Sequence, residues 1–130
     1  MLGDFNTTYI EGGEEAITWF DLTNDTDWQV YLSWAHFGDK HLFEHDFKPV
    51  GVNLGVPYIG VDDDTFEILQ NYLTSMDKSI VCDSTNCYGT KPIREYTLPD
   101  YSIKLSNKKE FTIPGEELMD PAGANSTYTC

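Results

Sequence analysis

Residues 50–73 constrain the fold more than any other part of this sequence, because three kinds of structural signal follow one another there. The run 50–52 predicts a buried apolar strand, and the glycine in 53–55 marks a tight turn before a second short strand. Three aspartates at 62–64 then precede apolar residues spaced by three or four positions, which is typical of a capped helix. We therefore predict strand, turn, strand and helix in that order, with the helix over 65–76.

The rest of the chain predicts antiparallel β structure. β-Branched and aromatic residues at 16–20 and 28–34 lie on either side of a polar turn and indicate one hairpin. Alternating apolar residues at 98–105 and 110–114 flank a second polar turn and indicate another hairpin. A chain of 130 residues with 40% hydrophobic content can bury one core. We expect a single, mostly β domain over residues 1–130, with one short helix.

The charge balance narrows the classes of partner. The formal net charge is −14, so the phosphates of nucleic acids and of anionic membranes would repel the chain. The sequence has no apolar run of about 18 residues that could span a bilayer. We expect no nucleic-acid partner and no membrane insertion, and we expect no cofactor because no phosphate-binding loop or Cys-x-x-Cys pair occurs.

Three Asn-x-Ser/Thr sequons begin at Asn6, Asn24 and Asn125, all in polar or turn-like surroundings. Three such sequons, together with three cysteines, favour passage through the oxidising secretory pathway. The first residues lack the basic and apolar regions of a signal peptide. We therefore expect a secreted or lumenal protein, in the vacuole or lysosome for example, of which this sequence is one part.

The segment His41-Leu-Phe-Glu44-His45 has the order of residues found in one class of zinc peptidase. That motif requires a helix, whereas this segment follows a Gly-Asp turn and has strand-like neighbours. In a strand, residues four apart lie about 13 Å from each other, too far for both imidazoles to bind one ion at about 2 Å. We predict exposed histidines on a hairpin and no metal site.

Short motifs in a consistent order suggest a family. Leu98-Pro99 begins an alternating strand, a polar turn follows, and Phe111-x-Ile113-Pro114 ends the second strand of that hairpin. Earlier in the chain, a Trp-Gln-Val-x-Leu strand occupies 28–32, and Gly3, Asn6, Tyr9 and Gly12 precede it. This series resembles the C-terminal lobe of the pepsin-like aspartic proteases. The resemblance implies that lobe's fold, an N-terminal lobe before residue 1 and further strands beyond Cys130.

The resemblance also places the family's catalytic Asp-Thr-Gly-Thr-Ser motif on residues 53–57, which read Asn53-Leu-Gly55-Val-Pro. The family's mechanism requires two carboxylates that share a proton around one water, one from each lobe. Asn53 supplies an amide, which has no basic form able to activate water, and only Gly55 is retained. We predict that this lobe is catalytically inactive. The carboxylates at 62–64 are expected to cap the helix, and neither a catalytic nor a calcium-binding role is expected for them.

Three cysteines allow one internal disulfide. The family resemblance implies a Cys82–Cys130 bridge, with Cys87 unpaired or bonded elsewhere. A local Cys82–Cys87 bridge is the rival, fully reduced thiols are a third alternative, and connectivity does not follow from sequence.

These observations lead to one functional hypothesis and two alternatives. The hypothesis is a secreted, glycosylated aspartic-protease homologue without peptidase activity, which serves as a polypeptide-binding or structural scaffold. Its partner would be the upstream N-terminal lobe or another protein chain. The alternatives are the C-terminal lobe of an active acid endopeptidase and a subunit of an extracellular assembly or homo-oligomer, since an isolated lobe exposes an unpaired sheet edge.

Overall fold

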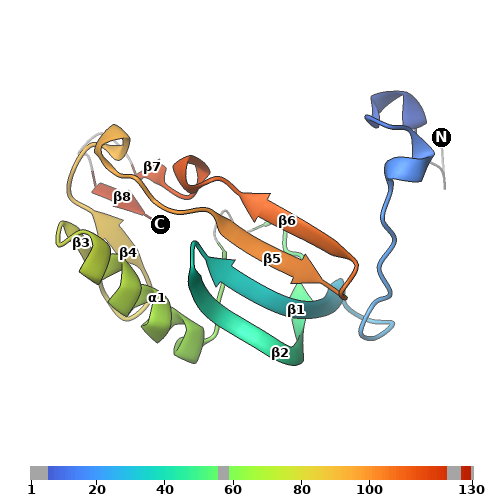
Figure 1. The fold of residues 1–130 in the computed structure, drawn as a ribbon, viewed down its shortest axis with the longest axis horizontal. Coiled ribbons are helices and arrows are strands. Elements are labelled where there is room, and N and C mark those ends of the chain that lie inside the picture. The colour runs from blue at the N-terminus through green and yellow to red at the C-terminus, as the bar shows by residue number, and fades with distance from the viewer. Residues whose placement is uncertain (1–5, 56–58, 123–126, 130) are drawn as a thin grey trace.

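The computed structural model describes residues 6–55, 59–122 and 127–129. Two four-stranded antiparallel sheets and one α-helix form the regular structure of these residues (Figure 1). The prediction of a mostly β, antiparallel fold with one helix is therefore confirmed. Four short 3₁₀ turns complete the described elements, and they span Thr7–Tyr9, Glu14–Ala16, Ile93–Glu95 and Gly115–Glu117.

The first sheet has the strand order β2-β1-β5-β6. Its two hairpins, β1–β2 and β5–β6, join through the antiparallel pairing of β1 with β5. The predicted C-terminal hairpin is thus confirmed as β5–β6. The bounds are Gln29–Phe37 for β1, Lys40–Gly51 for β2, Tyr101–Leu105 for β5 and Lys109–Ile113 for β6.

The predicted hairpin between 16–20 and 28–34 is wrong in its first strand. Residues 17–20 form no strand, and Trp19 is exposed. Strand β1 already pairs with β2 along one edge and with β5 along the other. No edge of β1 remains for a third partner, so residues 16–20 cannot pair with β1 as the predicted hairpin requires.

The second sheet has the order β3-β4-β8-β7 and consists of three-residue strands. The residues at 78–82 predict a strand from the sequence, and β3 lies within that range. Strands β4, β7 and β8 fall in segments rich in polar residues, proline and glycine, where alternation gives no signal. The bounds are Ile80–Cys82 for β3, Cys87–Gly89 for β4, Asp120–Ala122 for β7 and Thr127–Thr129 for β8.

Helix α1 spans Asp63–Met76, close to the predicted range. The side chain of Asp62 caps it by accepting a 2.8 Å hydrogen bond from the Thr65 amide. The helix is amphipathic, and its Tyr72 ring meets the Phe37 ring of β1 edge to face, with the ring centroids 5.7 Å apart. This apolar stripe attaches the helix to the sheet.

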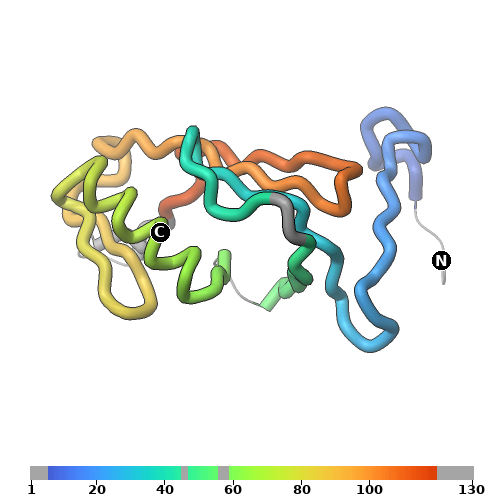
Figure 2. The backbone as a smooth tube through the Cα atoms, turned by 60° about the horizontal axis from the view of Figure 1, so that its bottom comes forward, coloured from blue at the N-terminus to red at the C-terminus, as the bar shows by residue number. Residues whose placement is uncertain are grey.

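The core lies where β1, β2 and β5 meet α1, β3 and β4. Its buried members are Ala35, Phe37, Leu42, Leu73, Ile80, Cys87 and Tyr101. The helix and the β3–β4 hairpin lie at one end of the first sheet, and the segment before β1 extends away at the other end (Figures 1 and 2). One face of the first sheet, which carries Ala35 and Phe37, packs into the core. We call the opposite face of this sheet its outer face.

Candidate functional site

The turn that aligns with the protease motif lies on the surface. Residues 51–55 are all exposed, and Leu54 retains 97% of its accessible surface. The Oδ1 of Asn53 accepts a 2.9 Å hydrogen bond from the Gly55 amide, which closes a local turn. Val56 and Pro57 lie outside the described residues. No carboxylate is present at position 53, and the amide oxygen of Asn53 accepts its hydrogen bond from the backbone of Gly55.

The prediction of a strand at residues 50–52 is confirmed for Val50 and Gly51, which end β2, but the prediction that it is buried is wrong. Strand β2 ends at Gly51, and Val52 is 60% exposed. The physical reason is the position of β2 at an edge of the first sheet, where it pairs with β1 alone. The residues that follow the end of β2 have no neighbouring strand on their outer side and remain exposed to solvent.

The aspartates at 62–64 have the capping role that was predicted. Asp62 is the helix N-cap, and Asp63 and Asp64 lie in the first turn. Hydrogen bonds from Thr65 and from the Lys48 ammonium, 3.0 Å away, lower the pKa of Asp62 to about 2. An acid that remains ionised in this way stabilises the positive end of the helix dipole.

Two of the three sequons fall in described segments and are exposed. The Asn6 side chain caps the first 3₁₀ turn and accepts hydrogen bonds from the amide and hydroxyl of Thr8. Asn24 makes the equivalent contacts with Thr26. Asn125 lies outside the described residues. At both described positions the sequon is a surface turn, where a glycan has room.

The disulfide joins Cys82 to Cys87, which corrects the preferred Cys82–Cys130 pairing. The two cysteines lie directly opposite each other in the β3–β4 hairpin, with their Cα atoms 4.0 Å apart. This short hairpin brings Cys87 to Cys82 by local folding, so Cys82 is no longer available for a distant partner. Cys130 lies outside the described residues.

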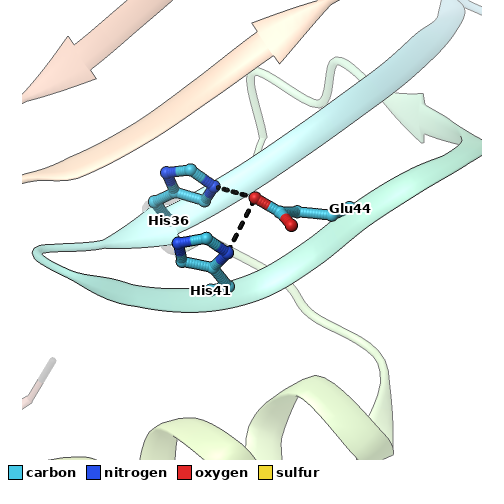
Figure 3. A group of neighbouring side chains, drawn as sticks. All are labelled: His36, His41 and Glu44. Carbon is cyan, nitrogen blue, oxygen red and sulfur yellow. Dashed lines mark hydrogen bonds and ion pairs between the residues drawn. The ribbon is translucent and has the colours of Figure 1, made fainter.

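A cluster of three polar side chains lies on the outer face of the β1–β2 hairpin (Figure 3). The Oε1 of Glu44 is 3.0 Å from the Nε2 of His36 and 2.7 Å from the Nδ1 of His41. The two imidazoles are stacked, with centroids 4.3 Å apart and planes within 13° of parallel. We call His36, His41 and Glu44 the His–Glu cluster.

The sequence motif pointed to His41, Glu44 and His45, and the structure brings together a different set. Strand β2 covers all three motif residues, so the helix that the zinc-peptidase motif requires does not form, as predicted. The His45 side chain lies outside the described part of the chain. The partner that sequence reasoning missed is His36, which the ladder pairs with His41. One feature of the sequence could have identified His36: a hairpin that turns at Gly38-Asp39 brings it opposite His41.

Exposed apolar side chains gather at the opposite end of the same hairpin. We call Trp28, Tyr31, Phe47 and Val52 the aromatic end. The Val52 amide donates a 2.9 Å hydrogen bond to the Trp28 carbonyl, and the Tyr31 and Phe47 rings meet edge to face at 6.1 Å.

A hollow separates the aromatic end from the His–Glu cluster. It lies where the β1–β2 ladder is interrupted between Leu32 and Trp34, and it is next to Glu44. Its lining residues are Ser33, Trp34, Glu44, Phe47 and Asn107.

Comparisons with known proteins leave the family open: no protein-family model and no curated protein matches this sequence. Among the described helices, none has the length and apolar character needed to cross a bilayer. The resemblance to pepsin-like proteases is therefore carried by the sequence motifs alone.

Proposed function

We propose that this chain is a glycosylated module of the secretory pathway or extracellular space, related to the C-terminal lobe of pepsin-like aspartic proteases but without peptidase chemistry. The observation that carries the proposal is the state of Asn53. Its amide lies in an exposed turn and bonds to Gly55, so position 53 offers no carboxylate to activate water. The exposed sequons at Asn6 and Asn24 and the Cys82–Cys87 bridge support an oxidising compartment.

The role that we propose is polypeptide binding, with an extended segment of another chain or of an upstream lobe as the occupant. The aromatic end places Trp28 and Phe47 in solvent, 78% and 56% exposed, and aromatic side chains of this kind anchor protein interfaces. It adjoins β2, an edge strand whose outer backbone groups can pair with an added strand. The net charge of −14 favours a partner rich in lysine and arginine.

Peptidase activity is the first test. The full chain is incubated with a denatured protein at about pH 3–5, with and without a transition-state-mimicking aspartic-protease inhibitor. We expect no cleavage, and we expect none from the matched variant Asn53→Asp, because restoring the carboxylate does not bury the exposed turn that carries it. Inhibitor-sensitive cleavage by the natural chain would instead support the alternative, the C-terminal lobe of an active acid endopeptidase.

Binding is the second test. A labelled, reduced and alkylated basic polypeptide is titrated with the full chain, and fluorescence anisotropy reports the complex. We expect Trp28→Ser combined with Phe47→Ser to weaken binding at least tenfold, since interface aromatics often contribute more than 1.4 kcal/mol each. Tyr9→Ser is the control, because Tyr9 is also an exposed aromatic residue, at 88%, but it lies in the first 3₁₀ turn and is not part of the aromatic end. Unchanged affinity in the double variant would refute the aromatic end as the binding surface.

A further inference from the structure

The His–Glu cluster brings together three side chains of the types that bind transition metals. His36, His41 and Glu44 each offer one ligand atom, and these three atoms lie within 4.8 Å of one another. Two imidazoles and one carboxylate form a common zinc-binding set. We propose that this cluster binds one Zn²⁺ ion, a property separate from the polypeptide binding proposed above.

The site depends on an irregularity in the β1–β2 ladder. In a regular strand, residues three apart such as His41 and Glu44 point to opposite faces. Here Ala35 pairs with Phe43 and His36 pairs with His41, so Leu42 is an extra residue in β2. The bulge lets Leu42 and Phe43 both pack toward the core. His41 and Glu44 therefore share the outer face, where β1 presents His36.

Two of the three distances within the cluster are close to those around a bound ion, and the ligand atoms of the two rings lie within 4.8 Å of each other. Ligand atoms of a tetrahedral zinc site lie about 3.3 Å apart when each bond is about 2.0 Å. The Glu44 oxygen is already 2.7 Å and 3.0 Å from the two ring nitrogens. Binding requires the Glu44 oxygen to move a few tenths of an ångström away from each ring nitrogen and the two ring nitrogens to lie about 3.3 Å apart, with the ring protons on the other nitrogens.

The two rings differ in exposure: His36 is packed between two rings, whereas His41 is mostly exposed. The His36 ring stacks between the rings of Trp34 and His41, and the ring centroids of His36 and Trp34 are 4.5 Å apart. His41 keeps 59% of its side chain exposed. Because the rings are nearly parallel, an ion in the plane of both requires a tilt, and His41 is the ring that can supply it.

The charges around the cluster favour a cation. Glu44 contributes a negative charge directly, and the whole chain carries −14. The positive residues nearest along the ladder are Lys40, which lies opposite Phe37, and Lys104, which lies opposite Trp34, whereas His36 lies opposite the neutral Ser102. Three protein ligands leave one coordination position open, which water can occupy.

Isothermal titration of the untagged full chain with Zn²⁺ at about pH 7.5 tests the proposal. We expect one ion per chain, and we expect His36→Ala, His41→Ala and Glu44→Gln each to weaken binding at least tenfold. His45→Ala is the matched control, because the proposed site does not include that residue, and it should bind as the natural chain does. If the natural chain at about micromolar concentration does not bind Zn²⁺ supplied in about 100-fold excess, the proposal is overturned.

A second readout separates loss of the site from loss of the fold. In a Trp19→Phe, Trp28→Phe background, Trp34 is the remaining tryptophan, and its stacking on His36 makes its emission sensitive to a paramagnetic ion there. We expect Cu²⁺, which imidazole sites bind more tightly than zinc, to quench this emission and to compete with Zn²⁺. Quenching that persists unchanged after His36→Ala, in a variant with natural circular dichroism, would contradict the assignment. So would a loss of binding caused by His45→Ala but not by His36→Ala.

Discussion

The Cα of Gly115 packs directly against the carbonyl oxygen of Leu98, at the start of the 3₁₀ turn that follows β6. A Cβ at position 115 would overlap that oxygen and would also come within 3.0 Å of the Pro99 carbonyl oxygen. The Gly115 amide donates a 2.9 Å hydrogen bond to the Oδ1 of Asp100 in the same segment. The chain after β6 is thus joined closely to the chain before β5.

We expect Gly115→Ala to lower the free energy of unfolding by about 1–3 kcal/mol, because the atoms in the way belong to backbone and cannot rotate aside. Urea denaturation followed by circular dichroism measures the change. Gly60→Ala is the matched control: a Cβ there meets no atom within 4 Å, so we expect no loss of stability. Equal stability of Gly115→Ala and the natural chain would show that the close approach to Leu98 is absent in solution.

Removal of the disulfide tests the pairing of Cys82 with Cys87. The double variant Cys82→Ser, Cys87→Ser should lose about 2 kcal/mol of stability, the value expected for a bridge that closes so short a loop. Peptide mapping without reduction should find a Cys82–Cys87 crosslink. A crosslink between Cys82 and Cys130 would reinstate the pairing that the family resemblance implies.

Acid should destabilise the chain through carboxylates that the fold keeps ionised. Hydrogen bonds from Ser79 and Lys91 lower the pKa of Asp77 to about 2, and hydrogen bonds from Thr85, Tyr88 and Asn86 do the same for Asp83. A pKa lower in the folded than in the unfolded chain stabilises the fold above about pH 4. That contribution is lost as the pH falls toward 2.

Urea midpoints measured from pH 5 to pH 2 should therefore fall, although charge repulsion is relieved as the chain approaches its isoelectric point near 4.2. Asp77→Asn should make the decline shallower, since it removes one of the responsible carboxylates. Asp25→Asn, on the exposed 24–27 turn, controls for the removal of one negative charge. A decline as steep in Asp77→Asn as in the natural chain would exclude Asp77 as a cause.

Local signals in the sequence were enough to predict several elements. The helix was found because Asp62 caps it and its apolar residues recur at helical spacing, features that act within a few turns. The β5–β6 hairpin was found because its strands alternate around a polar turn. Both predictions depend on neighbouring residues, and no distant part of the chain is needed to satisfy them.

Other features were decided by tertiary structure. Residues 16–20 have strong β-forming character but do not pair with β1, because β2 and β5 occupy both of its edges. The exposure of residues 51–55 follows from the edge position of β2, which an apolar run cannot reveal. The sequence of strand β4 shows no alternation of apolar and polar residues, and the strand forms through its pairing with β3.

The His–Glu cluster shows most clearly which features follow from the sequence and which depend on the tertiary structure. The sequence alone determined that His41 and Glu44 lie on a strand, so a helical His-x-x-Glu-His site was ruled out by spacing. Only the tertiary structure decided that they share a face with His36, because one extra residue, Leu42, turns into the core and shifts the register of the ladder. A register shift depends on how two strands and a core fit together, and a pattern read along one strand does not contain that information.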